Sequence, residues 1–410
     1  MATNSTAFLT WLDLTAADRD KVTKVLDLFS GRGTVDELGL GTLRDFLSDS
    51  LFPGTSVLHT RMRYALFIPW IYQLMERDHK RIEDVAGEAR AREIDLIKAL
   101  KAGHSGPGII GAEAGSGLSR LPSSAYWAAL VRWGVFVPRQ SQSWYHRHFR
   151  RLARSEPVGR ADDPGLTWTS EPTWHPRVPE PPTDLFELAN FRLTREEAAF
   201  VQGCIQANVN GSLLAWLAGE GGVSLSASAA LWEEPQVWEA PATITELAEL
   251  ARRFSLHVEG APLLYNLLLA EMRRDRAGDH NGSDSDHIED YRERLAEWAA
   301  REAEEAPFDP DALWALAALR GVAVKPCQKR FVEAWSKAIA QHGATSVADS
   351  TALRQLIEKR ERMLKGDRRA RTVNHSRLLD WRGDVGVGRM SFRWPQVRQI
   401  LTDLHQGLAN

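Results

Sequence analysis

Residues 36–72 read DELGLGTLRDFLSDSLFPGTSVLHTRMRYALFIPWIY, and this stretch decides which fold the chain can adopt. It combines four acidic residues and three arginines with an apolar run that ends at Trp70 and Tyr72. A charge beside an apolar core costs several kcal/mol unless a partner of opposite sign or a hydrogen bond compensates it. We therefore expect the charged side chains to pair with one another around the turn at residues 52–55. The predicted motif network consists of Asp36, Glu37, Arg44, Asp45, Asp49, Arg61 and Arg63.

Helical patterns dominate the rest of the chain. Thr194 and Thr243 are each followed three residues later by Glu, which is the pattern of a capping box. Ser123 is expected to cap a further helix. Apolar spacing predicts helices at 15–29, 81–101, 123–133, 287–305 and 350–364. At most, residues 109–110 and 322–324 form short strands, so the predicted fold class is mainly α.

A chain of 410 residues is long enough for two domains with separate cores. Residues 155–183 contain seven prolines, which forbid regular structure. We therefore predict two helical domains, 1–154 and 184–410, joined by a Pro- and Trp-rich linker at 155–183.

Composition narrows the class of protein. The net charge of −3 gives no global attraction to nucleic acid or anionic membranes. Cys204 and Cys327 show no disulfide or zinc spacing. The start of the chain does not resemble a secretory signal, and the apolar run at 64–75 is shorter than the ~20 residues that span a bilayer. These features predict a cytoplasmic protein without membrane contact, metal or cofactor.

The segment Gly106–Gly111 matches the pattern GxGxxG. Pro107 removes a backbone donor that a phosphate cradle needs, and the segment follows a helical pattern rather than a strand. We expect a loop here, and the ligand of residues 106–117, if one binds, stays open. No serine-hydrolase, zinc-protease or deaminase motif is present.

Two basic runs predict a nucleic-acid surface. In the first run, basic residues are interleaved with aromatic rings, which suits a phosphate backbone with exposed bases. In the second run, clustered Lys and Arg would contact phosphates irrespective of sequence. A solvated helix face or an acidic protein partner explains the same residues. The first run consists of Arg139, Arg147, His148, Arg150, Arg151 and Arg154. The second consists of Arg360, Arg362, Lys365, Arg368, Arg369 and Arg371.

The acids of the opening motif also allow a catalytic alternative. Asp45 and Asp49 are four residues apart, so a helix would place their like charges together and would require a positive partner. A divalent metal bound by Asp36, Asp45 and Asp49 would meet that requirement, as would the nearby arginines. The arginines favour a structural cluster, and the metal-dependent enzyme stays an alternative.

The opening motif resembles an uncharacterised bacterial domain-of-unknown-function family whose members carry DELGxGxxRDxxSDxLFPGTSxxxTRxRYxLFxPWIY. The similarity continues at RLPS (120–123), LLYN (263–266) and RWP (393–395), so it covers nearly the whole chain. The resemblance implies a setting in anti-phage defence islands, beside helicases and phospholipase-D-like nucleases. It implies no catalytic residues.

Together these observations predict a non-catalytic subunit or adaptor of a bacterial anti-phage defence complex. Its expected protein partner is a helicase or nuclease of the same gene cluster, with DNA as a second partner. A metal-dependent nuclease or hydrolase and a pure protein-interaction scaffold remain the alternatives.

Overall fold

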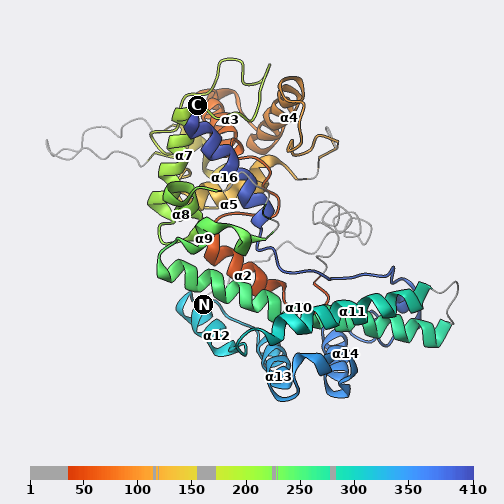
Figure 1. Cartoon of the computed structure of the whole chain (residues 1–410). Helices are drawn as coiled ribbons and strands as arrows, with labels where there is room; N and C mark the ends of the chain where they lie inside the picture. The colour runs from red at the N-terminus through yellow and green to blue at the C-terminus, as the bar shows by residue number, and fades with distance from the viewer. Residues whose placement is uncertain are drawn as a thin grey trace, which may run out of the picture. The chain divides into compact units, whose positions relative to one another are not determined.

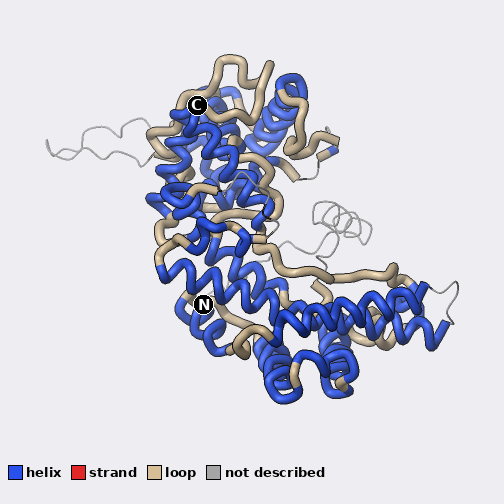
Figure 2. Tube along the Cα trace, viewed as in Figure 1, coloured by secondary structure: helices blue, strands red, loops and turns tan. Residues whose placement is uncertain are grey.

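The computed structural model describes residues 36–113, 117–118, 120–154, 172–223, 228, 230–277 and 283–410. Within these residues the chain consists of helices joined by loops and contains no strand (Figure 2). An isolated antiparallel bridge joins Phe136 and Trp174. The mainly α prediction is confirmed, and the two segments that allowed a short strand, 109–110 and 322–324, are loops and turns. The helix predicted at 15–29 lies outside the described residues.

The chain forms two compact units. Unit 1 comprises Met1–Thr42 and Arg253–Met390, and unit 2 comprises Leu43–Arg252 and Ser391–Asn410. This division differs from the linker expected at 155–183, whose described part falls within unit 2. The predicted domain boundary stays a prediction.

Unit 2 holds the helices on either side of the Pro-rich segment together with the last helix of the chain. Its elements are α3 (Tyr64–Arg77), η1 (His79–Arg81), α4 (Val85–Gly103), α5 (Pro122–Arg132), α6 (Gln142–Ala153), α7 (Arg195–Asn208), α8 (Leu213–Trp216), η3 (Leu217–Gly221), η4 (Leu231–Glu233), α9 (Pro235–Trp238) and α16 (Trp394–Ala409). Two further helices, α2 (Gly41–Leu51) and α10 (Ala242–Ala277), have residues in both units.

Helix α3 forms the centre of the unit 2 core. It is apolar on nearly all sides, and residues from Tyr64 to Tyr72 are buried without a break. A helix with apolar residues all round must be covered by neighbours, and α4, α5 and α6 contact it. The polar residues of α3, which include Gln73 and Glu76, are confined to its last turns.

Three predicted helix starts can be compared with the structure. Thr194 caps α7 in a complete capping box with Glu197, as predicted. Thr243 does not cap α10, because the helix already begins at residue 242. Ser123 lies inside α5 rather than before it, since Pro122 occupies the first turn, and the Ser123 hydroxyl donates to Glu93 instead (2.6 Å).

Unit 1 is built on α10 and the helices that follow it. These are α11 (Ser283–Ala303), α12 (Pro310–Leu319), α13 (Pro326–His342), η6 (Ala344–Asp349), α14 (Thr351–Lys365) and α15 (His375–Leu379). Helices α10 and α11 lie side by side (Figure 1), and Trp298 of α11 donates through Nε1 to the carbonyl of Leu256 in α10 (2.8 Å). Gly260 permits this approach, because a Cβ at that position would lie 2.5 Å from the Trp298 ring.

Replacing Gly260 therefore tests the packing of α10 on α11. Gly260→Ala should lower the free energy of unfolding by roughly 1–3 kcal/mol, because the added methyl group collides with an enclosed ring. Gly203→Ala in α7 is the matched control: a Cβ there meets no atom within 4 Å, so this variant should gain roughly 0.5–1 kcal/mol. Equilibrium urea unfolding measures both, and equal responses would contradict the packing argument.

Candidate nucleic-acid interface

Helix α6 presents two different faces. Ser141 begins the helix by accepting a hydrogen bond from the Trp144 amide (3.1 Å). Tyr145 and Phe149, four residues apart, are fully buried, so the opposite side faces solvent. We define the α6 surface by Trp144, Arg147, His148, Arg150, Arg151 and Arg154, of which the four arginines are exposed.

The arginines of the α6 surface are not neutralised by the fold. In the described part of the chain they make no ion pair, and their contacts are to backbone oxygens: Arg147 to Ser143 (3.3 Å) and Arg150 to Ile82 (3.2 Å). The exposed acids Glu83 and Asp84 follow Ile82, and Asp84 accepts the amide of Gly87 as the N-cap of α4. The α6 arginines therefore retain their charge for an anionic ligand.

Aromatic rings accompany this charge. Trp144 stacks on His148, with ring centroids 4.5 Å apart and planes inclined by 29°, and both side chains are half-buried. His146 lies in a different environment from His148. It contacts the Tyr72 hydroxyl (2.8 Å), and burial lowers its pKa. Arg139 precedes the helix, is exposed and donates to Asn208 (3.3 Å).

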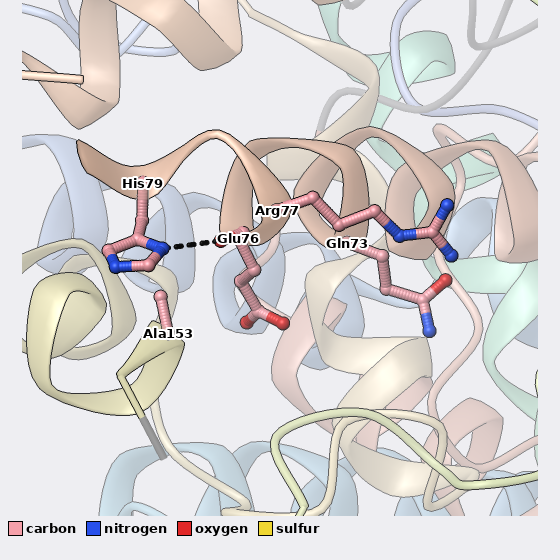
Figure 3. Close-up of a pocket in the computed structure, with 5 residues that line it drawn as sticks. All are labelled: Gln73, Glu76, Arg77, His79 and Ala153. Carbon is pink, nitrogen blue, oxygen red and sulfur yellow. Dashed lines mark hydrogen bonds between the residues drawn. The ribbon is translucent and has the colours of Figure 1, made fainter. Parts of the chain in front are cut away.

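A cavity of about 470 Å³ lies at the last turn of α6. It is lined by Gln73, Glu76, Arg77, His79 and Ala153 (Figure 3). His79 Nδ1 lies 2.9 Å from the carbonyl oxygen of Glu76, and Arg77 pairs with the exposed Glu180 (2.8 Å). The sequence prediction missed this cavity, because its polar residues occupy the end of an apolar helix. Their three-residue spacing, at 73 and 76, was the available signal.

The carboxyl group of Glu76, which lines this cavity, has a shifted pKa. Its Oε1 accepts hydrogen bonds from the Tyr145 hydroxyl (2.6 Å) and from Trp174 Nε1 (3.2 Å). Burial raises the pKa of the carboxyl group to about 7, because desolvation outweighs these two hydrogen bonds. The group is therefore partly protonated near neutral pH and can both donate and accept.

The second basic run is divided by the fold of unit 1. Arg360 is only 2% exposed and donates to the carbonyls of Leu38 (2.8 Å) and Cys327 (2.9 Å). Lys365 and Arg371 both pair with Glu37 of the opening motif, and Arg371 does so at 2.8 Å. These three cations are therefore engaged inside unit 1. The structure thus joins one residue of the predicted motif network, Glu37, to two residues of the predicted nucleic-acid set, Lys365 and Arg371.

Glu361 completes this buried cluster. Its side chain is fully enclosed and accepts hydrogen bonds from the Tyr265 hydroxyl, from Lys365 (2.9 Å) and from the amide of Thr372 (3.0 Å). Burial alone would raise the pKa of Glu361, but these hydrogen bonds and the Lys365 charge outweigh it and lower the pKa to about 2.

The other residues of the second run reach solvent. Arg362 pairs with Asp367 (3.0 Å), whereas Arg368 and Arg369 are exposed, and Arg369 donates to the carbonyl of Lys365 (3.1 Å). Half of this run is thus unsuited to contact a ligand. The role of both runs in binding nucleic acid stays a prediction.

The acids of the opening motif have separate partners. Asp36 accepts the amides of Leu40 (2.6 Å) and Gly41 (2.8 Å) at the start of α2. Asp45 pairs with its neighbour Arg44 (3.0 Å). Asp49 pairs with Arg393 (2.6 Å). Among the described residues, no group of three or more His, Cys, Asp and Glu side chains could hold a metal ion.

Two of the three arginines of the motif, Arg61 and Arg63, pair outside it. Arg61 forms a bidentate contact with Asp403 of α16, through Nε (2.9 Å) and Nη2 (2.9 Å). Arg63 donates to Glu197 of α7 (2.7 Å). The turn at 52–55 is held by other groups: Trp133 Nε1 donates to the carbonyl of Pro53, and Arg393 to that of Thr55. A single network closed within the motif is therefore not formed.

A Ser–His–Glu arrangement that the sequence prediction missed lies in unit 1. His257 Nε2 is 2.8 Å from Ser336 Oγ, and His257 Nδ1 is 2.7 Å from Glu302 Oε1, the order of contacts found in a hydrolase triad. All three residues are buried, Phe308 stacks on the imidazole at 4.8 Å, and Arg253 also pairs with Glu302 (3.3 Å). A nucleophile needs a cavity that admits substrate. We interpret this triad as a packing contact among α10, α11 and α13.

Replacing Asp403 tests the pairing of the motif arginines. Asp403→Ala should lower the free energy of unfolding by roughly 3–5 kcal/mol, because it leaves Arg61 without its buried partner. Asp45→Ala, which removes an exposed pair, should change it by less than about 1 kcal/mol. Urea unfolding of both variants makes the comparison, and similar losses would show that Asp403 does not anchor α16.

Glu361 provides a test that depends on pH. The pKa of Glu361 is lower in the folded protein than its usual 4.5, so the carboxylate stabilises the fold above that pH, and this contribution is lost as pH falls towards about 2. Glu361→Gln should therefore be less stable than wild type near neutral pH, and the difference should shrink on acidification below about 4.5. Unfolding midpoints measured across this range check the prediction.

The exposed Glu304→Gln is the control and should follow the wild-type pH profile. A difference between Glu361→Gln and wild type that stays constant down to the lowest pH would contradict the assignment.

A model of a family described as "Family of unknown function (DUF6361)" matches residues 6–407. No curated protein and no solved structure matches the chain. Among the helices of the described residues, none has both the length and the apolar content needed to cross a membrane.

Proposed function

The chain belongs to the family of unknown function DUF6361, and because membership supplies no activity, we propose from its geometry that it binds nucleic acid through the α6 surface. One observation carries this proposal: four exposed arginines without an acidic partner in the described residues lie on the same helix as a stacked Trp–His pair. Arginines bind phosphates irrespective of sequence, and aromatic rings stack on bases.

The engaged residues of the second run support this choice of surface. Arg360, Lys365 and Arg371 would have to leave buried carbonyls and carboxylates to reach a phosphate. Breaking a buried ion pair costs roughly 3–5 kcal/mol, more than a phosphate contact in water returns. Arg368 and Arg369 remain as secondary contacts.

In this proposal the protein is a non-catalytic subunit or adaptor of a bacterial anti-phage defence complex in the cytoplasm. A helicase or nuclease encoded beside it is the protein partner. The support for this part is the resemblance of residues 36–72 to a family whose genes are expected in anti-phage defence islands. Co-purification of the two proteins that survives nuclease treatment tests this part, and loss of the partner on treatment would refute a direct contact.

The separate partners of Asp36, Asp45 and Asp49 do not favour the metal-dependent alternative. The scaffold alternative differs from the proposal in one measurable property, the affinity for nucleic acid. The following test therefore separates the two.

Charge reversal on α6 tests the interface. Arg147→Glu, Arg150→Glu and Arg151→Glu together should weaken binding of single-stranded DNA at low salt by more than about tenfold. The slope of log K against log salt should fall by about 0.7 for each phosphate that the protein no longer neutralises. Fluorescence anisotropy of labelled oligonucleotides across a salt series measures both quantities.

The matched control reverses three exposed arginines that already have acidic partners. Arg274, Arg292 and Arg377, each paired with an acidic residue, give the same change in net charge. This triple variant should bind within about threefold of wild type. Equal losses in the two variants, or no binding by wild type at low salt, would overturn the proposal.

A further inference from the structure

The cavity beside α6 lies next to the proposed phosphate contacts. Ala153 lines it from the last turn of α6, where Arg150 lies three residues earlier on the same side of the helix and Arg154 follows in the chain. It is a hollow of about 470 Å³ that is largely open to solvent, so part of a bound strand can enter it from the surface. A strand that follows the arginines would therefore pass the mouth of a cavity that can hold part of it.

The polar groups of the cavity suit the edge of a nucleobase. Gln73 and Glu76 are three residues apart on α3, and their amide and carboxyl groups extend from the same side of the helix (Figure 3). An amide supplies a donor and an acceptor, and so does a protonated carboxyl group. Base edges present the same alternation of donors and acceptors.

Glu76 is held in a fixed orientation for such a contact. Tyr145 and Trp174 both donate to its Oε1, whereas Oε2 makes no hydrogen bond in the described part of the chain. The raised pKa reduces the negative charge at the cavity near neutral pH, which limits repulsion of a phosphate backbone. His79 adds an aromatic ring to the wall.

We propose that this cavity binds one unstacked nucleobase of a single strand, with Gln73 and Glu76 contacting the base edge while the α6 arginines contact neighbouring phosphates. The inference rests on the proposed function and narrows its ligand to single strands. A base in a duplex is stacked and paired, so it reaches a pocket only after costly extrusion. The same base chemistry is offered by a free nucleotide, which the test includes.

The test compares three probes on the full chain: single-stranded oligonucleotides about 12 nucleotides long, an abasic strand of equal length, and free nucleoside monophosphates. Wild type should prefer the base-bearing strand over the abasic one. In Gln73→Ala with Glu76→Gln this preference should fall by at least about fivefold, because the cavity no longer presents the same polar groups to the base edge. The slope against salt should stay unchanged, because every arginine that meets a phosphate is still present.

Glu76→Gln retains an acceptor for Tyr145 and Trp174, and a circular dichroism melt confirms that the variant is folded. The control changes the same residue types at the same spacing on α14, as Gln355→Ala with Glu358→Gln, and should keep the wild-type preference. An unchanged preference in the cavity variant overturns the base site and leaves the α6 interface standing. Binding of free nucleotides as tightly as the strand overturns the strand assignment, and no binding of any strand by wild type overturns both proposals.

Discussion

Both units depend on buried charges whose partners lie far away in the sequence. In unit 2, Arg61 joins Asp403 of the last helix, and in unit 1, Glu37 joins Lys365 and Arg371. A buried ion is costly unless its partner is placed with good geometry, so each pair fixes the relative position of two distant segments. The density of charge in the opening motif is thus explained by long-range pairing. It is not explained by a cluster closed on itself.

The sequence predicted the helices better than their partners. Helical periodicity and the capping box at Thr194 are local properties, and the structure contains the corresponding helix. Ser123 and Thr243 were assigned as caps by the same local rule, yet each lies within a helix that starts earlier. At Ser123 the reason is physical: Pro122 suits the first helical turn, and the buried carboxyl of Glu93 accepts the serine hydroxyl. No window of sequence around residue 123 contains that acceptor.

The two basic runs look alike in sequence but differ in the structure for a similar reason. On α6, the buried pair Tyr145 and Phe149 places the arginines on the solvent side, and this could be read from their spacing. On α14, the decisive neighbour of Arg360 and Lys365 is the segment that begins at Glu37, which is more than three hundred residues away. Spacing along a helix cannot reveal a partner from another part of the chain. The basic composition of the two runs therefore predicted a larger exposed basic surface than the fold presents.

The order of segments in unit 2 has a consequence for biosynthesis. Its final helix, α16, carries Asp403 and packs on α7, but the ribosome makes the whole of residues 253–390 before it. Until Asp403 is synthesised, the guanidinium of Arg61 has no carboxylate partner. The earlier helices of this unit therefore emerge from the ribosome with an incomplete core. A nascent chain stalled before residue 391 would expose the face of α7 that α16 covers. Chaperones or proteases would then recognise the incomplete chain.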